Sequence, residues 1–306
     1  MQASPESRRV GWLPRGLTFL AVGIILTMLA VIFGNIFFGG LRTISIEFLT
    51  AFPEQGMMAG GIFPAIFGTA ALVILMTVAV LPLGVLTAIY LHEYARPDAV
   101  TTRWIRQAIY NLAGVPSIVF GLFGLGFFVS FVGGGIDAIL HPDAGPVWGQ
   151  PAIIWASLTM AVLTLPVVIV STEEAMRTVP RAMREGSFAL GAGRMQTMRH
   201  IVLPQAMPGI LTGAILAVSR GAGEVAPIMF TGVAYYQAHL PTGLTDQFME
   251  LGYHIYVLAT QSPDVEQSLP LLYGTVLVLL ALTFVLNLTA VSIRSKLRRR
   301  QRLLPY

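Results

Sequence analysis

Arg220 and Glu224 are distinctive in this chain because they are charged and lie within a long apolar run. Four residues separate them, so a helix would place both on one face, where they can form an ion pair. The arginine guanidinium carries a fork of N–H donors that suits an anion, and the carboxylate could hold or release that fork. The alternative is a structural ion pair that only fixes helix packing. We favour an anion pathway, because ionisable side chains within membrane-spanning helices are usually functional.

The helix that must carry this pair is expected to span residues 205–232. Counting from Pro208 at about 1.5 Å per residue, Arg220 would lie roughly 18 Å into a hydrocarbon core of about 30 Å. Small residues recur at every fourth position and would let a neighbouring helix approach closely: Gly209, Gly213, Ala217 and Gly221. Arg220 would therefore border a stripe that faces protein.

Enzymatic chemistry is not indicated by this sequence. A Walker A loop needs a Gly-Lys pair, and the one lysine, Lys296, follows a serine. The His92-Glu93 pair could begin a zinc-protease motif, but Arg96 stands where its second histidine would be. The chain contains no cysteine, which excludes disulfides and thiolate metal sites. We therefore predict no catalytic residue, no metal site and no cofactor on this chain.

The composition is that of an integral membrane protein. Of the 306 residues, 55% are hydrophobic and 11% are charged, whereas soluble domains carry about 25% charged residues. Six apolar runs are long enough to cross a bilayer as helices. They lie at about 17–38, 62–90, 108–132, 151–171, 205–232 and 271–293, within a spanning domain of residues 17–293. Polar tails at 1–16 and 294–306 flank this domain.

The basic residues predict the orientation. All but two of the 19 lysines and arginines lie in the two tails, the 93–107 loop or the 172–205 loop. Such an excess marks the cytoplasmic side, so both termini are expected in the cytoplasm, with the chain in the inner membrane of a bacterial cell. The basic C-terminal tail is expected to meet anionic lipid headgroups in the bilayer rather than nucleic acid.

The 172–205 loop contains an amphipathic stretch that continues to residue 208. Pro180 can open a helix whose apolar side would carry Met183, Phe188 and Leu190, with Arg181 and Arg184 solvated. Gly191 and Gly193 would then allow a sharp turn through conformations closed to other residues. A second short helix would present Met195, Met198 and Ile201 and stop near Leu203 and Pro204. Such a hairpin is suited to docking a partner, although an amphipathic segment held by anionic lipid is the commoner structure.

The spacing within this loop resembles the EAA motif of ABC-importer permeases, E-A-A-x3-G-x9-I-x-L-P. Glu185, Gly191, Ile201, Leu203 and Pro204 match it, while Gly186 and Ser187 replace the two alanines with other small residues. The resemblance implies a coupling helix that is pressed into a groove of a separate ATPase subunit.

Four further stretches resemble the phosphate-specific permease family, in particular its PstA-type half: residues 60–69, 81–93, 115–122 and 220–227. In the last of these, Val225 replaces a threonine of the family's R-x3-E-T-A-P segment. The resemblance implies an all-α integral membrane protein with six transmembrane helices and the type I ABC importer permease (MetI-like) fold. The expected function is import of inorganic phosphate into the cytoplasm.

The same resemblance implies the partners: a homologous second permease, two ATPase subunits that bind ATP and Mg, and a periplasmic phosphate-binding protein. The 233–270 loop, which holds Asp246, Glu250, Asp264 and Glu266 but no lysine or arginine, would help receive the binding protein. It could equally be a solvated loop that is acidic because basic residues are kept inside.

Two alternatives stay open at this point. A permease for sulfate, molybdate or phosphonate would share the coupling loop. A membrane scaffold or sensor without transport would have no ATPase partner.

Overall fold

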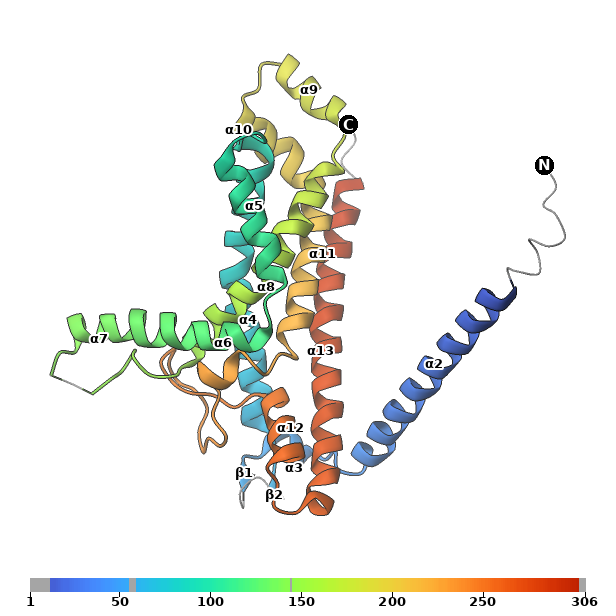
Figure 1. Cartoon of the computed structure of the whole chain (residues 1–306), viewed down its shortest axis with the longest axis vertical. Helices are drawn as coiled ribbons and strands as arrows, with labels where there is room; N and C mark the ends of the chain where they lie inside the picture. The colour runs from blue at the N-terminus through green and yellow to red at the C-terminus, as the bar shows by residue number, and fades with distance from the viewer. Residues whose placement is uncertain (1–11, 55–58, 144, 303–306) are drawn as a thin grey trace.

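The computed structural model describes residues 12–54, 59–143 and 145–302, which form a helical bundle with short connecting elements (Figure 1). The long helices are α2 (Trp12–Leu41), α4 (Phe63–Ile89), α8 (Ile153–Arg177), α11 (Leu203–Gly221) and α13 (Val265–Arg302). Shorter ones are α3 (Ile46–Thr50), α5 (Val100–Ala113), α6 (Ser117–Phe123), α7 (Gly134–Leu140), α9 (Arg181–Ala189), α10 (Arg194–Thr197) and α12 (Leu251–Thr260). Wide π-type turns form η2 (Tyr90–Tyr94), η3 (Gly124–Gly133) and η4 (Met198–Val202), and η5 (Ile228–Phe230) is a 3₁₀ turn.

Six helical segments of the described chain are long and apolar enough to cross a membrane, which confirms the predicted number of spans. They are Pro14–Leu41, Phe63–Tyr94, Ser117–Leu140, Ile153–Arg177, Arg194–Gly221 and Glu266–Lys296. The sheet is minimal: β1 (Pro53–Glu54) pairs antiparallel with β2 (Ala59–Gly60). The protein is therefore an all-α membrane protein, as its composition indicates.

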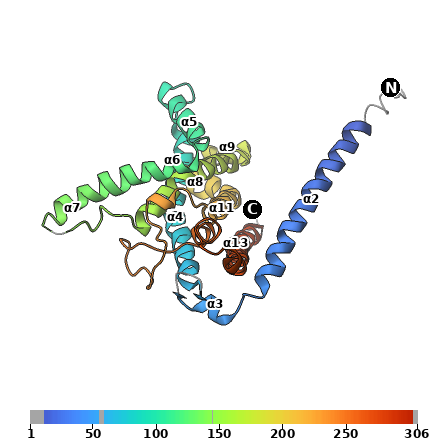
Figure 2. The same cartoon turned by 60° about the horizontal axis from the view of Figure 1, so that its bottom comes forward.

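Helix α8 lies at the centre of the bundle, between α4 and α11 (Figure 2). Within its most apolar stretch 67% of the residues are buried, against none in α2. Glycines allow this close contact: a Cβ on Gly84 of α4 would lie 2.6 Å from Val168, and one on Gly209 of α11 would lie 2.4 Å from Ala175. Gly209 and Gly213 of the predicted stripe thus pack against α8, while a Cβ on Gly221 would lie 2.6 Å from Met76 of α4.

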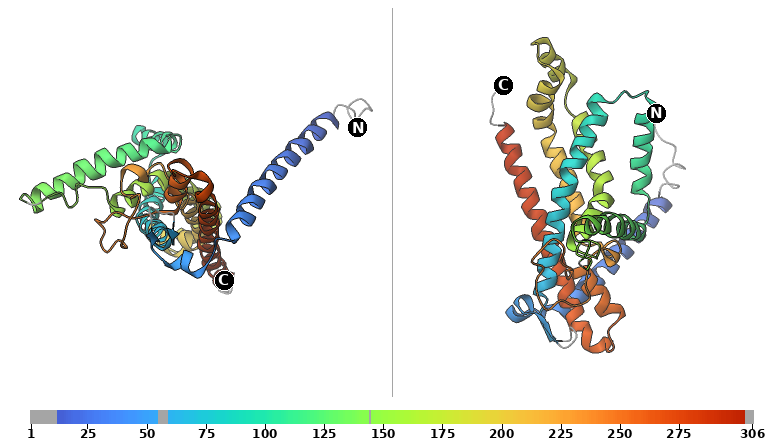
Figure 3. Two further views of the ribbon diagram at one scale, coloured as in Figure 1. Left: turned by 90° about the horizontal axis from the view of Figure 1, so that it is seen from below. Right: turned by 90° about the vertical axis from the view of Figure 1, so that its left-hand side faces the viewer.

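Helix α2 leans away from the bundle and touches it near its end (Figures 1 and 3). There Gly40 lies so close to α13 that an added Cβ would be 2.6 Å from the carbonyl oxygen of Tyr273. The helix begins at Trp12, inside the stretch predicted as a tail, and residues 1–11 lie outside the described chain. At the other terminus α13 continues through the predicted tail as far as Arg302, and 303–306 lie outside the described chain.

The third apolar segment differs from the prediction. Residues 108–113 belong to α5, which occupies most of the predicted 93–107 loop, and the next helix begins only at Ser117. Pro116 is extended, with φ −58° and ψ 139°, so the chain changes direction between the two helices. Figure 1 shows that α6, η3 and α7 then run crosswise to α4, α8, α11 and α13.

The fifth span is displaced toward the N-terminus: the continuous helix covers Arg194–Gly221, and α11 ends at Gly221 rather than near residue 232. The chain then forms η5 and joins the 233–270 loop, where the Ala234 N–H donates to the Phe248 carbonyl at 2.8 Å. This loop, with α3, β1 and β2, lies at the end of the bundle opposite α9 (Figure 1).

Three of the four acidic residues of this loop have structural roles. Asp246 accepts backbone hydrogen bonds from Thr242 and Gly243, and Asp264 accepts one from Gln267. Glu250 is 1% exposed and caps α12, accepting from the Gly252 and Tyr253 N–H groups at 2.8 and 2.7 Å. Glu266 is exposed.

Glu250 should make the stability of this loop depend on pH. Burial raises the pKa of its carboxyl to about 7, although hydrogen bonds from Gly252, Tyr253 and Thr69 act in the opposite direction. A carboxyl whose folded pKa is raised stabilises the fold fully below its unfolded pKa of 4.5, and that contribution is lost as the pH rises through 7. The thermal midpoint of the detergent-solubilised protein should therefore fall between about pH 5 and 8.

The variant Glu250→Gln should flatten that pH profile, since its side chain stays neutral while one oxygen still accepts a hydrogen bond. Glu266→Gln, which removes an exposed carboxylate from the same region, is the matched control. Equal slopes for the wild type and Glu250→Gln would contradict the assignment.

Candidate functional site

The predicted hairpin is present between α8 and α11. Helix α9 begins after Pro180, and the chain reverses at Gly191, whose φ is +84°. A Cβ on Gly191 would meet no described atom within 4 Å, so glycine is needed there for its backbone conformation alone. The prediction for Gly193 is wrong, because φ −75° and ψ 166° describe extended backbone open to other residues.

The second arm of the hairpin does not stop at Leu203 and Pro204. Instead α10 continues through η4 directly into α11. The Leu203 N–H bonds to the carbonyl of Met198, five residues back, which widens the helix just before Pro204. Proline cannot donate the next hydrogen bond and its ring crowds the preceding turn, so a π-type turn lets the helix continue.

The outer side of the hairpin is exposed. None of the nine residues of α9, all within the described chain, is buried. Glu185 is exposed beside large apolar side chains, with Phe188 46%, Leu190 90% and Met195 67% exposed. Ile201, Leu203 and Pro204 lie half-buried at the base of the second arm. The hairpin therefore presents an apolar surface with an acidic residue in it.

The two arms are joined on the inner side by a hydrogen bond. The hydroxyl oxygens of Ser187 and Thr197 lie 2.9 Å apart, and Thr197 is buried. A Cβ on the neighbouring Gly186 would meet no described atom within 4 Å. Of the two residues that replace alanines of the motif, Ser187 thus adds a specific contact.

Arg184 is not solvated, contrary to the prediction. Its guanidinium pairs with Glu93 of η2 and donates to the Met176 carbonyl of α8 at 2.9 Å. Only 17% of the Arg184 side chain is exposed. The two arginines of α9 therefore differ: Arg181 is exposed to solvent, whereas Arg184 is held against neighbouring elements.

A second arginine bridges the same two elements. Arg106 of α5 donates to Glu173 of α8 at 2.8 Å and to the Leu91 carbonyl of η2 at 2.9 Å. We call Arg106, Arg184, Glu93 and Glu173 the arginine clasp. It joins α5 and α9 to the adjoining ends of α4 and α8.

Arg220 and Glu224 do form the predicted pair, with Nε and Oε1 3.1 Å apart. The pair does not lie in mid-helix, however, because Arg220 is in the last turn of α11 and Glu224 follows the helix end. The side chains are 42% and 23% exposed. A cation at a helix C-terminus also complements the helix dipole. The pair is thus an accessible one at a helix end, not a buried mid-helix pair.

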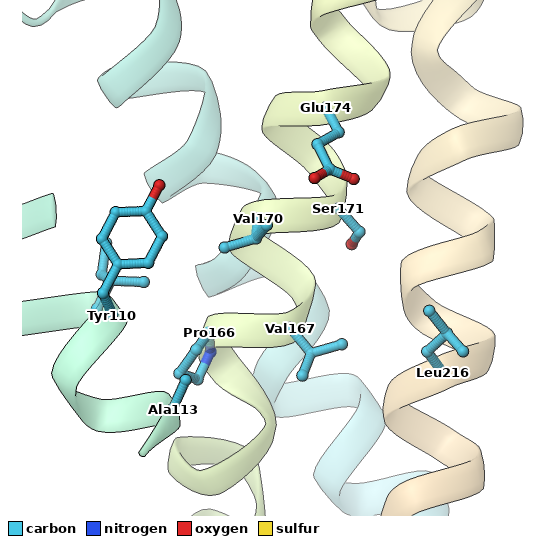
Figure 4. A pocket seen from close by; sticks show the side chains of 9 residues that line it. Tyr110, Ala113, Pro166, Val167, Val170, Ser171, Glu174 and Leu216 are labelled. Atoms are coloured by element: carbon cyan, nitrogen blue, oxygen red, sulfur yellow. The ribbon is translucent and has the colours of Figure 1, made fainter. Parts of the chain in front are cut away.

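A groove lies between α5, α8 and α11 (Figure 4). Its volume is about 320 Å³, and its lining is mostly apolar. Glu174 and Ser171 contribute polar atoms from α8, and Leu216 contributes from α11, one turn before Arg220. The groove therefore reaches α11 at Leu216, and neither Arg220 nor Glu224 is among its lining residues.

Sequence reasoning missed the clasp and the groove. The partners in the clasp are 67 and 91 residues apart, so no local pattern indicates them. Two adjacent carboxylates, Glu173 and Glu174, close the fourth apolar run, and this is the signal that could have marked that helix end.

Loss of Arg106 should destabilise the protein. Glu173 is buried, and its Oε1 atom already has no hydrogen-bond partner among the described residues. The change Arg106→Ala would leave a buried carboxylate without a cation, at a cost of about 2 kcal/mol of unfolding free energy. Thermal unfolding in detergent should show this, while Arg103→Ala, which removes an exposed arginine of the same helix, should have little effect. Equal midpoints for both variants would contradict the role of the pair.

Comparison with known proteins assigns this chain to a family. The family model described as "Binding-protein-dependent transport system inner membrane component" matches residues 80–303. The probable ABC transporter permease protein YqgI of Bacillus subtilis (strain 168) is 36% identical over 219 residues, covering 72% of this chain and 69% of that protein. The phosphate transport system permease protein PstA 1 of Mycobacterium tuberculosis (strain ATCC 25618 / H37Rv) is 35% identical over 253 residues, covering 82% and 74%.

A further relative and two solved structures agree. The probable phosphate transport system permease protein PstA of Methanocaldococcus jannaschii is 33% identical, covering 86% of this chain and 87% of that protein. A chain of the bacterial alginate ABC transporter in complex with its alginate pentasaccharide-bound periplasmic protein has a TM-score of 0.66 at 16% identity, covering 93% and 94%. A chain of the MetNI methionine ABC transporter in an inward-facing conformation has a TM-score of 0.52 at 18% identity, covering 78% and 94%. These structures confirm the expected fold. The chain belongs to the family of inner membrane components of binding-protein-dependent transport systems.

Proposed function

We propose that this chain is the membrane-spanning permease subunit of an ATP-driven importer that carries inorganic phosphate into the cytoplasm. The observation that carries the proposal is the hairpin: no described residue of α9 is fully buried, and Phe188 of α9 and the Leu190 that follows it are exposed beside Glu185. A large apolar surface on a loop outside the spans is suited to a protein partner. The assignment of phosphate is supported by the relatives named PstA.

The hairpin would dock an ATPase subunit, with Glu185, Gly186, Ser187, Gly191, Ile201, Leu203 and Pro204 forming the coupling loop. Two such ATPases would bind ATP and Mg and supply the energy. No group on this chain would take part in hydrolysis.

A second, homologous permease would complete the pathway. The groove between α5, α8 and α11 is open on one side, and six helices provide few walls for a closed route. A periplasmic phosphate-binding protein would deliver the anion to the end of the bundle that carries α12; dependence on a binding protein is in keeping with the family description. The distribution of basic residues supports placing both termini and the hairpin in the cytoplasm.

Arg220 and Glu224 would line the route of the anion. The guanidinium is partly exposed, so its free N–H groups can offer a fork to a phosphate oxygen pair, while Glu224 holds the side chain in place. ATP binding would close the ATPases and move the hairpins together, which would open the route outward, and hydrolysis would reset it.

Uptake competition tests the cargo. Proteoliposomes that contain the assembled transporter should accumulate labelled phosphate when ATP is inside and the loaded binding protein outside. Unlabelled phosphate in excess should abolish that signal, and sulfate or molybdate at the same concentration should leave it unchanged. Loss of the signal with sulfate would assign a different oxyanion, and no ATP-dependent uptake would contradict the function.

Removing the guanidinium tests the pathway. Arg220→Ala should lower phosphate uptake by about tenfold or more, since a charge-assisted hydrogen bond to the anion is lost. Arg220→Lys, which keeps the charge without the fork, should have intermediate uptake. Membranes should contain normal amounts of assembled complex for both variants. Arg42→Ala, which removes a charge elsewhere, is the control, and wild-type uptake by Arg220→Ala would exclude the assignment.

A further inference from the structure

The arginine clasp links the exposed hairpin to the spanning helices. Arg184 of α9 reaches both the end of α4, through Glu93, and the end of α8, through the Met176 carbonyl. Arg106 makes the corresponding pair of contacts from α5, with Leu91 and Glu173. Each arginine therefore bridges the ends of α4 and α8, and Arg184 also connects these ends to the hairpin.

Few contacts attach α9 to the rest of the protein, so the contact made by Arg184 is one of its main connections. None of the described residues of α9 is fully buried, and of its large apolar side chains Met183 is half-buried and Phe188 is exposed, so apolar packing against the bundle is slight. Two polar side chains connect it to the neighbouring elements: Ser187 bonds to Thr197 within the hairpin, and Arg184 bonds outside it. A force applied to the exposed side of α9 would thus reach α4 through Arg184.

The element that Arg184 contacts at the end of α4 is η2, whose geometry is suited to a change of conformation. Glu93 lies in η2, a π-type turn in which the Ala95 N–H bonds to the Tyr90 carbonyl at 2.9 Å. Such turns are wider than α-helix and occur often at functional sites. Arg106 grips the same turn through Leu91, so η2 is held from two sides.

We propose that Arg184 is a positioning residue that transmits movement of the hairpin to the ends of α4 and α8, so that ATPase closure changes the groove between α5, α8 and α11. The inference rests on the proposed function, because it assigns the step between the docked ATPase and the pathway. Glu93 is its partner in this step. Arg106 and Glu173 keep the two helix ends together, so that both move when Arg184 is displaced.

The ion pair between Arg184 and Glu93 has properties suited to transmitting movement. An arginine fork bonds to two acceptors at fixed angles, so it resists displacement in more than one direction. Arg184 and Glu93 are 17% and 22% exposed, which protects the pair from screening by salt. A solvated arginine such as Arg181 on the same helix has no comparable hold on its surroundings.

The test compares Arg184→Ala with Arg181→Ala in the assembled complex in proteoliposomes. Arg184→Ala should keep its ATPase subunits and hydrolyse ATP, while phosphate moved per ATP falls about tenfold, the effect of losing roughly one charge-assisted bond. Glu93→Gln should reproduce this uncoupling, Arg184→Lys should restore part of it, and Arg181→Ala should match the wild type. A wild-type ratio in Arg184→Ala, or loss of the ATPase subunits from it, would overturn the proposal.

A second measurement does not depend on the cargo. The chain has no cysteine, so a single Val170→Cys in the groove can be labelled without background. ATP should change its labelling rate when Arg184 is present and leave it unchanged in Arg184→Ala. An ATP-dependent change in both backgrounds would refute the role of Arg184. If the Val170→Cys complex with Arg184 intact shows this change while the complex without the cysteine takes up no phosphate, the proposed cargo is contradicted instead.

Discussion

Close contact between α8 and its two neighbours is the constraint on which the rest of this structure depends. Glycine at Gly84, Gly209 and Gly213 leaves no room for a side chain, so the backbones of α4 and α11 approach α8 directly. In a bilayer, lipid is as apolar as the helices, and association depends on such packing rather than on the hydrophobic effect. The hairpin therefore extends from a helix that is packed on both sides, by α4 and by α11.

Polar contacts organise the two ends of the bundle that this packing leaves open. At one end Glu250 caps α12 from a buried position and bonds to the Thr69 hydroxyl of α4. At the other end the arginine clasp joins α5 and α9 to α4 and α8. Glu250 receives three donors, whereas Glu93 and Glu173 each pair with one arginine, and these contacts offset part of the cost of burying the carboxylates.

The hairpin connects α8 to α11, and the same two helices also line the groove. Helix α8 ends three residues before Pro180 opens the hairpin, and its last turns carry Ser171 and Glu174 into the groove. Helix α11 begins after the hairpin, contributes Leu216 to the groove and carries Arg220 one turn further on. Any displacement of the hairpin therefore acts on helices that line the proposed route. This continuity places the proposed docking surface and the proposed pathway on the same two helices, and Arg184 adds a contact from the hairpin to the end of α8.

The sequence by itself determined the number of spans, the reversal at Gly191 and the Arg220–Glu224 pair. These depend on local properties: the length of an apolar run, a φ of +84° that favours glycine, and a separation of four residues. Only the tertiary structure decided where α11 ends, which way the third apolar segment runs and what Arg184 binds. The chain leaves α11 at Gly221 and forms hydrogen bonds with residue 248, and the clasp joins residues up to 91 positions apart. Such contacts form between distant segments, so their geometry exists only once the bundle has brought those segments together.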